Sequence, residues 1–496
     1  MRETMKGGRL VVPLLILLNV ALTLTLSLKL NIWIDEAFSL HTTGKGFGYA
    51  LQQALNFELQ APLYFLLLNL WRKIFSSIFF ARLFSVVCVA LALWTVACLS
   101  RRFWKEVHPG WIVAAVAFNP LAISVAVEVR LYALALLLTA LLLLTFYDGF
   151  LSETKSRRAQ ICYVLLAVAA LYTQYYMGFL LVANACALLV LRRWRPLFEY
   201  LAGMVIVALC FSPMLPFIRY QMSPHTAPVR QPISWFLAFE FVTWRVKHYL
   251  LPADSDALII VRSWLLRVCY VAAFIILIKK RRSLKPEMIA LWTITLFIAL
   301  VFFIMAHLSG DKLLVPHHTT VLLLPVLFAV FSIVILAGRR EVLLAWTLIA
   351  LLFSGSYLYL RYRPMAKYGD WQRVASYLMH SEKQGQAILV FHGGAALPLS
   401  QYYAGVNPLV PLPRENTFER FDFHDYILRD EREIDAALGR AGAGHEQLWL
   451  VTDGDCGFAD IKYNCSILEE FVNRYYIVEE VKYFNGSMVR RLRRRA

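Results

Sequence analysis

Charged residues are scarce in this sequence. Only 17% of its 496 residues are Asp, Glu, Lys or Arg, whereas 59% are hydrophobic. Soluble globular proteins carry about 25% charged residues, so this composition excludes that class. The chain is instead expected to be a polytopic α-helical membrane protein.

Acidic residues are fewer than basic ones, 33 against 50, and the formal net charge is +17. The basic residues do not form one stripe with interleaved aromatic side chains, so no nucleic-acid partner is expected. They are divided among short loops between apolar segments, which the positive-inside rule identifies as cytoplasmic. The five basic groups are Arg101, Arg102 and Lys105; Lys155, Arg157 and Arg158; Arg192, Arg193 and Arg195; Lys279 to Arg282; and Arg339 and Arg340.

Long apolar runs are abundant. The run from Val11 to Leu30 contains one charge, Lys29. At about 1.5 Å per residue it is long enough to cross a hydrocarbon layer of about 30 Å. No small-residue cleavage pattern follows it, and basic residues precede it, so a retained signal anchor with a cytoplasmic N-terminus is expected. The apolar segments predict about eleven spans, at residues 10–30, 81–100, 110–127, 131–149, 160–173, 177–191, 199–219, 257–278, 287–306, 318–337 and 342–360.

One hydrophobic stretch, Ala61 to Phe80, does not fit the alternation of loops, and Arg72 and Lys73 interrupt it. It is predicted to be an amphipathic or re-entrant helix at the outer surface. Residues 31–80 then form one large external loop. An odd number of spans puts the C-terminus outside.

The composition changes after Leu360, where polar residues become frequent and no apolar run reaches spanning length. Residues 1–360 are expected to form the membrane domain, and residues 361–496 a soluble extracytoplasmic α/β domain. The terminal run from Arg490 to Arg495 is expected to be solvated or bound to acidic headgroups. In the smaller domain the predicted strands are 387–391 and 448–451, and the predicted helices are 430–438 and 466–475.

Six of the eight cysteines lie within predicted spans, where a thiol usually packs as a small apolar residue. Cys456 and Cys465 lie in the external domain, separated by a loop that contains Gly and Asn. They are predicted to form a disulfide in an oxidising compartment.

The segment from Trp33 to Ser39 lacks metal-ligand spacing, nucleotide-binding glycines and a nucleophile elbow. Its usable groups are the adjacent carboxylates of Asp35 and Glu36, which come just after the first span. They suit a general base or a metal ligand at a membrane surface. The alternative is that they cap the next helix or solvate a loop.

A further carboxylate, Glu128, lies at the outer end of a span, in a sequence that is otherwise almost wholly apolar. Ionisable residues at membrane depth usually pair and usually mark a functional cavity, which makes Glu128 and Arg130 candidates. Glu128 and Tyr132 are expected to share a helical face, whereas Arg130 points elsewhere. The alternative is a structural ion pair that fixes a tight loop.

A third polar group follows Gly310. Lys312 suits an anion such as phosphate, and His317 and His318 can add donors. With Asp35 or Glu128 the two histidines can also ligate a divalent metal. The alternative for these histidines is a solvated loop.

The chain resembles the C-superfamily (GT-C) of integral-membrane glycosyltransferases, particularly the branch that contains protein O-mannosyltransferases and lipid A aminoarabinose transferases. The resemblance extends over nearly the whole length. Its motifs are individually short but occur in order and on one side of the membrane. They are Asp35-Glu36, Ala61-Pro62-Leu63-Tyr64, Ala81-Arg82-Leu83-Phe84-Ser85, Glu128-Val129-Arg130-Leu131-Tyr132 and Asp370-Trp371.

The resemblance implies an inverting transfer of a hexose or pentose from a polyprenyl-phosphate donor, on the extracytoplasmic face of the cell membrane. The acceptor is a lipid, a glycan or a protein. Asp35 carries over as the general base, with Glu36 and Glu128 orienting acceptor or base. Cations that bind the departing phosphate lower the barrier; the candidates are Arg82, Arg130, Lys312, His317 and His318. The residues assigned to the acceptor or its entrance are Tyr64, Tyr132, Asp370 and Trp371.

The chain departs from the family pattern at two places. His317-His318 stands where many relatives have an Arg-Tyr pair, and Ala61 stands where His or Pro often occurs. No sugar identity is therefore transferred, because one fold serves different donors and acceptors. A divalent metal is left open.

Two other functions remain open. A transporter or flippase predicts paired or broken helices near the midplane, whereas the charges here gather at outer helix ends. A scaffold protein would bind partners through the external domain, but it gives Asp35, Glu36, Glu128 and Lys312 no reason to converge.

Overall fold

The computed structural model describes residues 10–223, 226, 232–310, 316–441, 446–454, 456–458 and 461–496. The chain divides into two compact units. The membrane unit comprises Met1–Leu28, Gln60–Pro216 and Arg230–Arg361, and the sheet unit comprises Lys29–Leu59, Phe217–Val229 and Tyr362–Ala496. Each unit is therefore built from three separate stretches of sequence.

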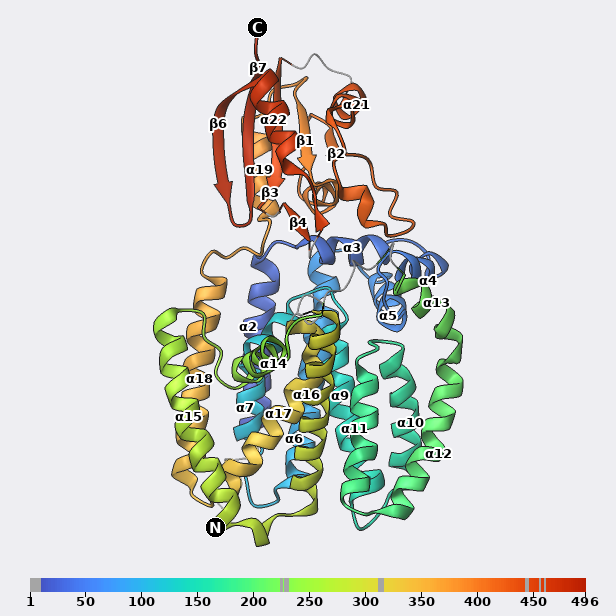
Figure 1. The fold of residues 1–496 in the computed structure, drawn as a ribbon, viewed down its shortest axis with the longest axis vertical. Helices are drawn as coiled ribbons and strands as arrows, with labels where there is room; N and C mark the ends of the chain where they lie inside the picture. Colours follow the sequence, from blue (N-terminus) through green and yellow to red (C-terminus); the bar gives the residue numbers. More distant parts are fainter. Residues whose placement is uncertain are drawn as a thin grey trace. The chain divides into compact units, whose positions relative to one another are not determined.

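The membrane unit is helical, and its long helices run alongside one another (Figure 1). Its helices are α2 (Val11–Lys29), α5 (Leu63–Arg72), α6 (Ile78–Phe103), α7 (Gly110–Ala117), α8 (Pro120–Ala126), α9 (Tyr132–Phe146), α10 (Arg157–Leu171), α11 (Met177–Val190), α12 (Trp194–Phe211), α14 (Trp235–Leu250), α15 (Asp256–Lys279), α16 (Pro286–Ser309), α17 (Thr320–Leu336) and α18 (Arg340–Tyr362). Helix α13 (Leu215–Gln221) is divided between the two units.

Within the described residues, eight helical segments are long and apolar enough to cross a membrane. The protein is a multi-pass membrane protein, as its composition predicts. The eight segments are Val11–Lys29, Ile78–Phe103, Tyr132–Leu151, Trp194–Gln221, Asp256–Lys279, Pro286–Ser309, His317–Leu336 and Arg340–Tyr362. The three other predicted spans also coincide with helices, namely the α7–α8 pair, α10 and α11, which are shorter.

The predicted span 110–127 is broken into α7 and α8 at Asn119 and Pro120. Proline has no backbone N–H and is favoured at the first position of a helix, so Pro120 begins a new helix here. The Asn119 side chain forms hydrogen bonds with backbone groups around the break. Its Oδ1 accepts from the Leu121 N–H at 3.0 Å, and its Nδ2 donates to the Tyr249 carbonyl at 2.9 Å. The break therefore attaches α8 to the end of α14.

The amphipathic helix predicted within Ala61 to Phe80 is present as α5, but it covers only part of that stretch. Helix α5 ends at Arg72, and α6 begins at Ile78, three residues before the predicted span. The Ser77 side chain caps α6 by accepting from the Phe80 N–H at 3.2 Å, which explains why a new helix starts there. The sequence analysis also missed α14, because its charged residues break the apolar pattern of a span.

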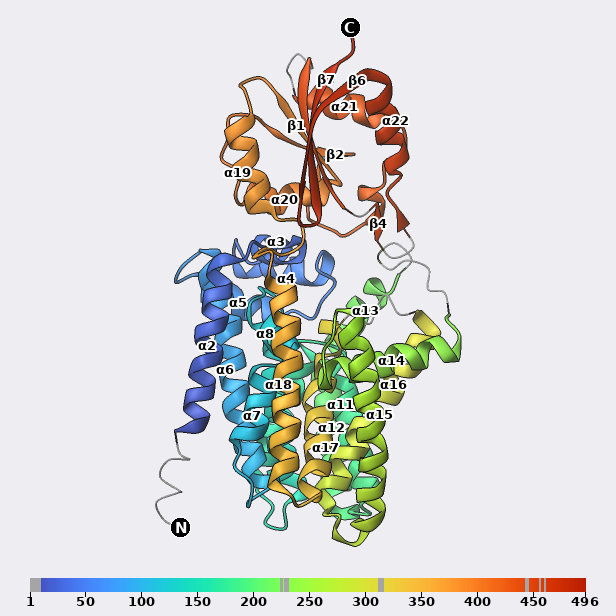
Figure 2. The same cartoon turned by 90° about the vertical axis from the view of Figure 1, so that its left-hand side faces the viewer.

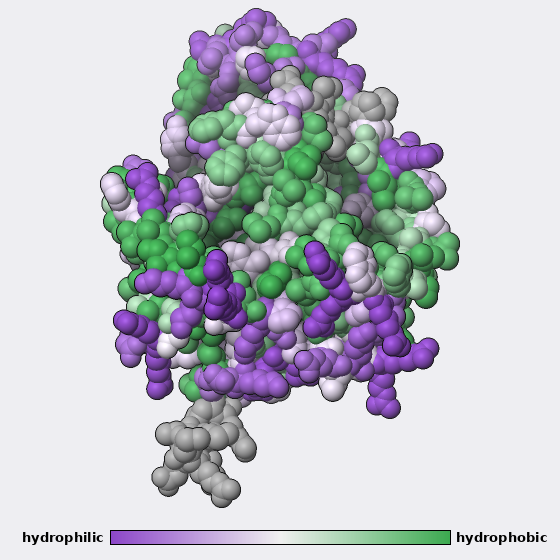
Figure 3. Space-filling view, turned by 60° about the horizontal axis from the view of Figure 1, so that its bottom comes forward, coloured by the Kyte–Doolittle hydropathy of each residue, from purple (hydrophilic) through white to green (hydrophobic). Residues whose placement is uncertain are grey.

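The five basic groups lie at one end of the membrane unit. Residues from several of these loops, including Arg102, Lys105, Arg193 and Lys280, line a common cavity of about 700 Å³. Figure 3 views this end, where hydrophilic side chains gather below the hydrophobic flanks of the helices. The charge asymmetry that the sequence predicts is therefore present in the folded unit.

The sheet unit is an α/β layer structure. Its strands are β1 (Ala387–Phe391), β2 (Leu409–Leu412), β3 (Gln447–Asp453), β4 (Gly457–Phe458), β5 (Ile461–Lys462), β6 (Tyr476–Phe484) and β7 (Ser487–Arg494). Its helices are α3 (Ile34–Thr42), α4 (Phe47–Asn56), α19 (Trp371–Ser381), α20 (Ala396–Ser400), α21 (Glu431–Ala441) and α22 (Cys465–Tyr475). The strands and helices that the sequence predicts in this unit are confirmed.

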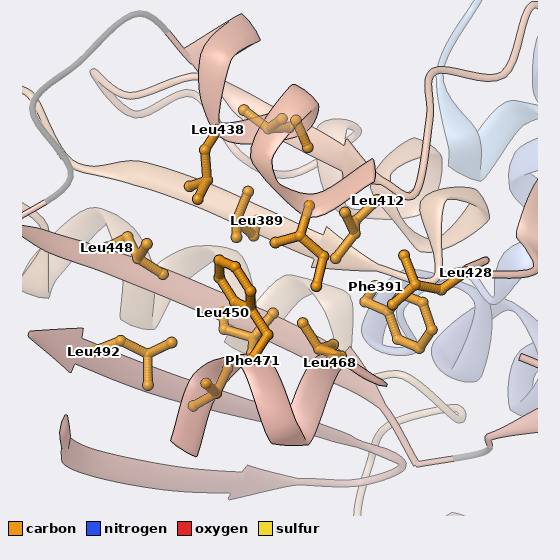
Figure 4. Close-up of a cluster of buried hydrophobic side chains, with 14 of the residues drawn as sticks. Leu389, Phe391, Leu412, Leu428, Leu438, Leu448, Leu450, Leu468, Phe471 and Leu492 are labelled. Atoms are coloured by element: carbon orange, nitrogen blue, oxygen red, sulfur yellow. The ribbon is translucent and has the colours of Figure 1, made fainter. Parts of the chain in front are cut away.

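The main sheet has the strand order β2-β1-β3-β7-β6. Strand β1 is parallel to β2 and β3, and β7 is antiparallel to β3 and β6. Helices α19 and α20 cover one face, and α21 and α22 cover the other (Figure 2). Figure 4 shows the leucine-rich core between the sheet and α21–α22.

The terminal arginine run is not a solvated tail, which corrects the sequence-based expectation. Most of it is strand β7, paired on both sides in the sheet. Arg490 is buried and makes a bidentate pair with Glu469 at 2.7 Å. Arg493 pairs with Glu479 of the neighbouring strand β6 at 2.7 Å. Carboxylates on α22 and β6 thus compensate the charges that make this segment look like a tail.

Candidate functional site

Asp35 and Glu36 lie in the first turn of α3, in the sheet unit. Negative charge is stabilised there, because the N–H groups at the start of a helix carry partial positive charge. The Glu36 carboxylate accepts from the Trp33 backbone N–H at 3.3 Å, which caps the helix. The capping role that the sequence analysis left open therefore applies to Glu36.

Glu36 is completely buried and forms an ion pair with Lys367, with 2.7 Å between Oε2 and Nζ. The Lys367 backbone N–H also donates to Asn31 Oδ1 at 2.8 Å. Two contacts therefore fasten the segment before α3 to the segment after α18. A buried charge needs such a partner, so the pair fixes the position of the first turn and of Asp35 beside it.

Asp35 is half-buried and lies close to the loop that follows β1. The neighbouring Ile34 approaches Gly394 so closely that a Cβ on this glycine would lie 3.1 Å from the Ile34 side chain. Burial raises the pKa of Tyr426, and the charges of Tyr463, Asp425 and Asp35 raise it further. The Asp35 carboxylate thus shares its surroundings with Tyr426.

Glu128, in the membrane unit, lies in the turn between α8 and α9 and not on a helix. The expectation that Glu128 and Tyr132 share a helical face was wrong, because α9 begins only at Tyr132. Glu128 Oε1 accepts from Ser124 Oγ at 3.1 Å, and the Glu128 carbonyl accepts from Ser85 Oγ at 2.6 Å. These bonds hold the turn and orient the carboxylate.

Tyr132, His317 and His318 gather in one aromatic cluster in the membrane unit. The Tyr132 ring centroid lies 4.6 Å from that of His317 and 5.9 Å from that of His318. The charges of His318, Arg130 and Arg245 all act on the His317 ring. The two histidines are therefore part of a packed polar cluster and not a solvated loop.

Helix α14 brings two further basic side chains, Arg245 and His248, to this region. Arg245 is buried and lies over the rings of Phe241 and Trp244, at 4.8 and 4.7 Å from their centroids. His248 stacks on Trp244 with 5.3 Å between centroids. The Tyr249 hydroxyl on the same helix bonds to Thr319, which directly follows His318. The aromatic faces thus stabilise the charge of Arg245 without neutralising it.

Arg262 of α15 completes a buried Arg–His cluster, defined as Arg245, His248 and Arg262. Arg262 is 3% exposed, and its charge and that of Arg245 act on His248. Among the described residues, Arg262 Nε and Nη1 and His248 Nδ1 have no hydrogen-bond partner. Because a buried guanidinium is costly without an anion, Arg262 makes this cluster suited to bind one.

Several predicted site residues have structural contacts. Arg82 is buried, and its Nη1 donates to the Ser27 carbonyl at 2.9 Å, at the end of α2. Tyr64 is buried beside Phe65 and Phe84.

Asp370 and Trp371 are also buried in the fold. Asp370 pairs with Arg373 at 3.0 Å, and Trp371 belongs to the core beneath α19. Lys312 lies outside the described residues.

The sequence analysis missed Lys367, Arg245, His248 and Arg262. Lys367 is only three residues before the noted Asp370-Trp371 motif, but its partner lies 331 residues away. Arg262 is a charge inside the predicted span 257–278, and that position alone was a usable signal. Arg245 and His248 were overlooked together with α14.

No group of three or more His, Cys, Asp or Glu side chains that would hold a metal is found among the described residues. Cys456 and Cys465 are joined by a disulfide, with 5.9 Å between their Cα atoms. The other six cysteines are free thiols.

The architecture matches a solved structure over almost its whole length. ArnT from Cupriavidus metallidurans, crystallised with undecaprenyl phosphate, aligns with a TM-score of 0.56 over 96% of this chain and 97% of ArnT. The sequence identity is 14%. The chain has the GT-C glycosyltransferase fold.

Two other GT-C structures are similar at lower TM-scores. The Archaeoglobus fulgidus oligosaccharyltransferase in complex with Zn and sulfate has a TM-score of 0.45, with 12% identity, 95% of this chain covered and 72% of the other. Mycobacterial arabinofuranosyltransferase AftD has a TM-score of 0.40, with 14% identity, 97% of this chain covered and 40% of AftD. No protein-family model and no curated protein matches the chain.

Proposed function

We propose that this GT-C chain is a membrane glycosyltransferase that moves a sugar from a polyprenyl-phosphate donor to an acceptor hydroxyl, with inversion at the anomeric carbon. The observation that carries the proposal is the buried Arg–His cluster of the membrane unit, and within it the Arg262 guanidinium, whose Nε and Nη1 have no hydrogen-bond partner among the described residues. A buried guanidinium within an apolar helical unit needs an anion, and a lipid-linked phosphate supplies one. ArnT, which has the same fold, was crystallised with a lipid of this kind.

In the proposed reaction Asp35 is the general base. The Asp35 carboxylate takes the proton of the acceptor hydroxyl as its oxygen forms a bond to the anomeric carbon. The bond between that carbon and the phosphate oxygen breaks, and the electron pair leaves with the polyprenyl phosphate. The leaving group is already a stable anion, so the reaction needs no strong general acid.

The basic side chains of the membrane unit are proposed to bind the leaving phosphate. Arg245, His248 and Arg262, together with Arg130 and the neighbouring histidines, bind the phosphate and stabilise the charge that develops on it. Glu36 acts through Lys367 by fixing the turn that carries Asp35. Glu128 orients the acceptor or the base.

Two features support the proposed orientation in the membrane. The end of the membrane unit with the basic loops faces the cytoplasm under the positive-inside rule. The disulfide between Cys456 and Cys465 fits an oxidising compartment, so the sheet unit faces away from the cytoplasm. A lipid-linked donor suits that side, because its sugar is delivered at the membrane surface.

Binding of undecaprenyl phosphate to the detergent-purified chain tests the donor assignment. Arg262→Gln should weaken binding by at least about tenfold, since a charge-assisted contact to phosphate contributes about 1.5–3 kcal/mol. The matched control is Arg267→Gln, on the same helix, because Arg267 is exposed and lies over Trp264. The control should change the dissociation constant by less than about twofold. Equal affinity in the parent, Arg262→Gln and His248→Gln would contradict the assignment.

A further inference from the structure

A cavity in the sheet unit lies outside the residues that the proposed reaction uses. Its volume is about 390 Å³, within the range of small-molecule sites. It is lined at the ends of β1 and β3 by Phe391, Thr452 and Asp453, and it is closed by α22 and by the β6–β7 hairpin. The disulfide between Cys456 and Cys465 forms part of its wall.

The position of this cavity in the sheet is one that binds ligands in many α/β proteins. Strands β1, β2 and β3 are parallel, with β2 on one side of β1 and β3 on the other. The chain passes from β1 to β2 at one edge of the sheet and from β3 to β6 at the other edge. The connections after β1 and β3 therefore leave in opposite directions, which opens a crevice at the carboxyl ends of these two strands. Phe391 and Asp453 are the last residues of β1 and β3.

The polar groups of the cavity favour a neutral ligand. Asp453 Oδ2 lies 3.0 Å from His392 Nε2, and Glu469 is bound by both terminal nitrogens of Arg490 at 2.7 Å. Two carboxylates disfavour an anion, and their existing partners reduce the attraction for a cation. Each carboxylate has several lone pairs and can still accept hydrogen bonds from hydroxyl groups.

The apolar groups suit a flat, hydroxyl-bearing ring. Phe391 and Phe484 contribute to the wall, and Tyr483 lies on the hairpin with 74% of its surface exposed. An exposed aromatic face beside paired carboxylates binds a sugar ring through its C–H face, while the ring hydroxyls donate to the carboxylates. Thr452 lies in the same wall.

The cavity is connected within the sheet unit to the turn that carries Asp35. A Cβ on Gly394 would lie 3.1 Å from Ile34, the neighbour of Asp35, and 3.0 Å from Tyr426. The Tyr426 ring centroid lies 5.4 Å from that of His392. His392 in turn pairs with Asp453, which lines the cavity. A sugar in the cavity is therefore held by the same local framework that carries the proposed base.

We propose that this cavity binds a neutral sugar residue of the acceptor, so that the acceptor of the reaction is a glycan or a glycolipid. The acceptor role rests on the proposed glycosyltransferase function, whereas sugar binding itself does not. Tyr483 and Asp453 are the residues that recognise the sugar.

Ligand-detected NMR and titration calorimetry on the detergent-purified full chain, without any donor, test the proposal. The probes are glucose, galactose, mannose and N-acetylglucosamine, each also as a disaccharide, and sulfate as an anionic comparison. At least one sugar should bind saturably, and Tyr483→Ala should weaken it by at least about fivefold, since such an aromatic contact contributes about 1 kcal/mol or more. The matched control is Tyr475→Ala, because Tyr475 is also an exposed aromatic of this unit but does not line the cavity.

Asp453→Asn is the second variant, because it keeps the shape of the side chain while removing the charge. It should weaken sugar binding while Tyr475→Ala leaves it unchanged. The proposal is overturned if no probe sugar binds, if sulfate binds in preference to sugars, or if the Tyr483 and Tyr475 variants lose binding equally. If the chain binds a sugar in this cavity but transfers none, the binding site is supported while the proposed transferase function is contradicted.

Discussion

Glu36 and Lys367 are 331 residues apart in the sequence and form a buried ion pair, with 2.7 Å between Oε2 and Nζ. The pair joins the turn that carries Asp35 to the segment that follows the last helix of the membrane unit. It explains why the sheet unit includes residues from the beginning of the chain.

Replacement of Lys367 by Met should destabilise the sheet unit. The change leaves the completely buried Glu36 carboxylate without this partner, and the removal of one member of a buried pair costs about 3–5 kcal/mol. Thermal unfolding of the purified chain measures the loss, and Glu36→Gln in the Lys367→Met background should restore part of it. The exposed Lys383→Met is the control. If Lys367→Met is no less stable than Lys383→Met, the pair has no structural role.

The stability of the chain should depend on pH through His41. Burial lowers the pKa of His41 below its ordinary value of 6.5, and the nearby charge of Lys45 lowers it further. The unfolded chain therefore binds a proton more readily than the folded chain. The stability contribution is present above about pH 6.5 and is lost as the pH falls towards the lowered pKa.

Comparison of unfolding midpoints at pH 7.5 and pH 5.5 isolates this effect. The parent should lose more stability over this interval than His41→Gln does. His424→Gln is the control, because His424 is exposed at the surface of the same unit. An identical pH response in the parent and in His41→Gln would exclude the predicted contribution.

Loss of the disulfide should destabilise the sheet unit by about 2–4 kcal/mol, because the cross-link restricts the unfolded chain. The test is the unfolding midpoint of the double variant Cys456→Ser and Cys465→Ser. A reductant should lower the midpoint of the parent but not that of the variant. Cys162→Ser with Cys210→Ser, which removes two exposed free thiols of the membrane unit, should leave the reductant effect intact.

Replacement of Glu128 by Gln should impair activity without unfolding the chain. Gln keeps an oxygen that accepts from Ser124, so the turn between α8 and α9 should be retained. The loss of the charge should lower kcat/KM for sugar transfer by about tenfold to a hundredfold. Glu106→Gln, at an exposed position of the same unit, is the control. Equal kcat/KM in both variants would remove Glu128 from the site.

The membrane helices were predictable because their signal is local. Apolar runs and basic loops mark each span within about twenty residues, and the chain follows them closely. The helix boundaries that were predicted wrongly depend on single residues whose effect on the backbone hydropathy does not capture. Asn119 and Pro120 divide one span, and Ser77 starts a new helix after the end of α5.

The candidate site was only partly predictable, because its contacts join distant segments. Asp35, Glu128 and the histidine pair were found as charges or polar groups in apolar surroundings. Lys367 was missed because nothing beside it in the sequence indicates that Glu36 is its partner. Arg490 was misread because its neighbours form a basic run, whereas its partner Glu469 lies on the preceding helix α22.

The most direct test of the account is the transfer of radiolabelled sugar from a panel of polyprenyl-phosphate sugars, in membranes that contain equal amounts of each variant. The parent should transfer sugar, and Asp35→Asn should lower the rate by at least about a hundredfold, as expected for loss of a general base. Asp430→Asn, at an exposed position of the same unit, should retain the parental rate. Transfer by Asp35→Asn at the parental rate would contradict the central claim.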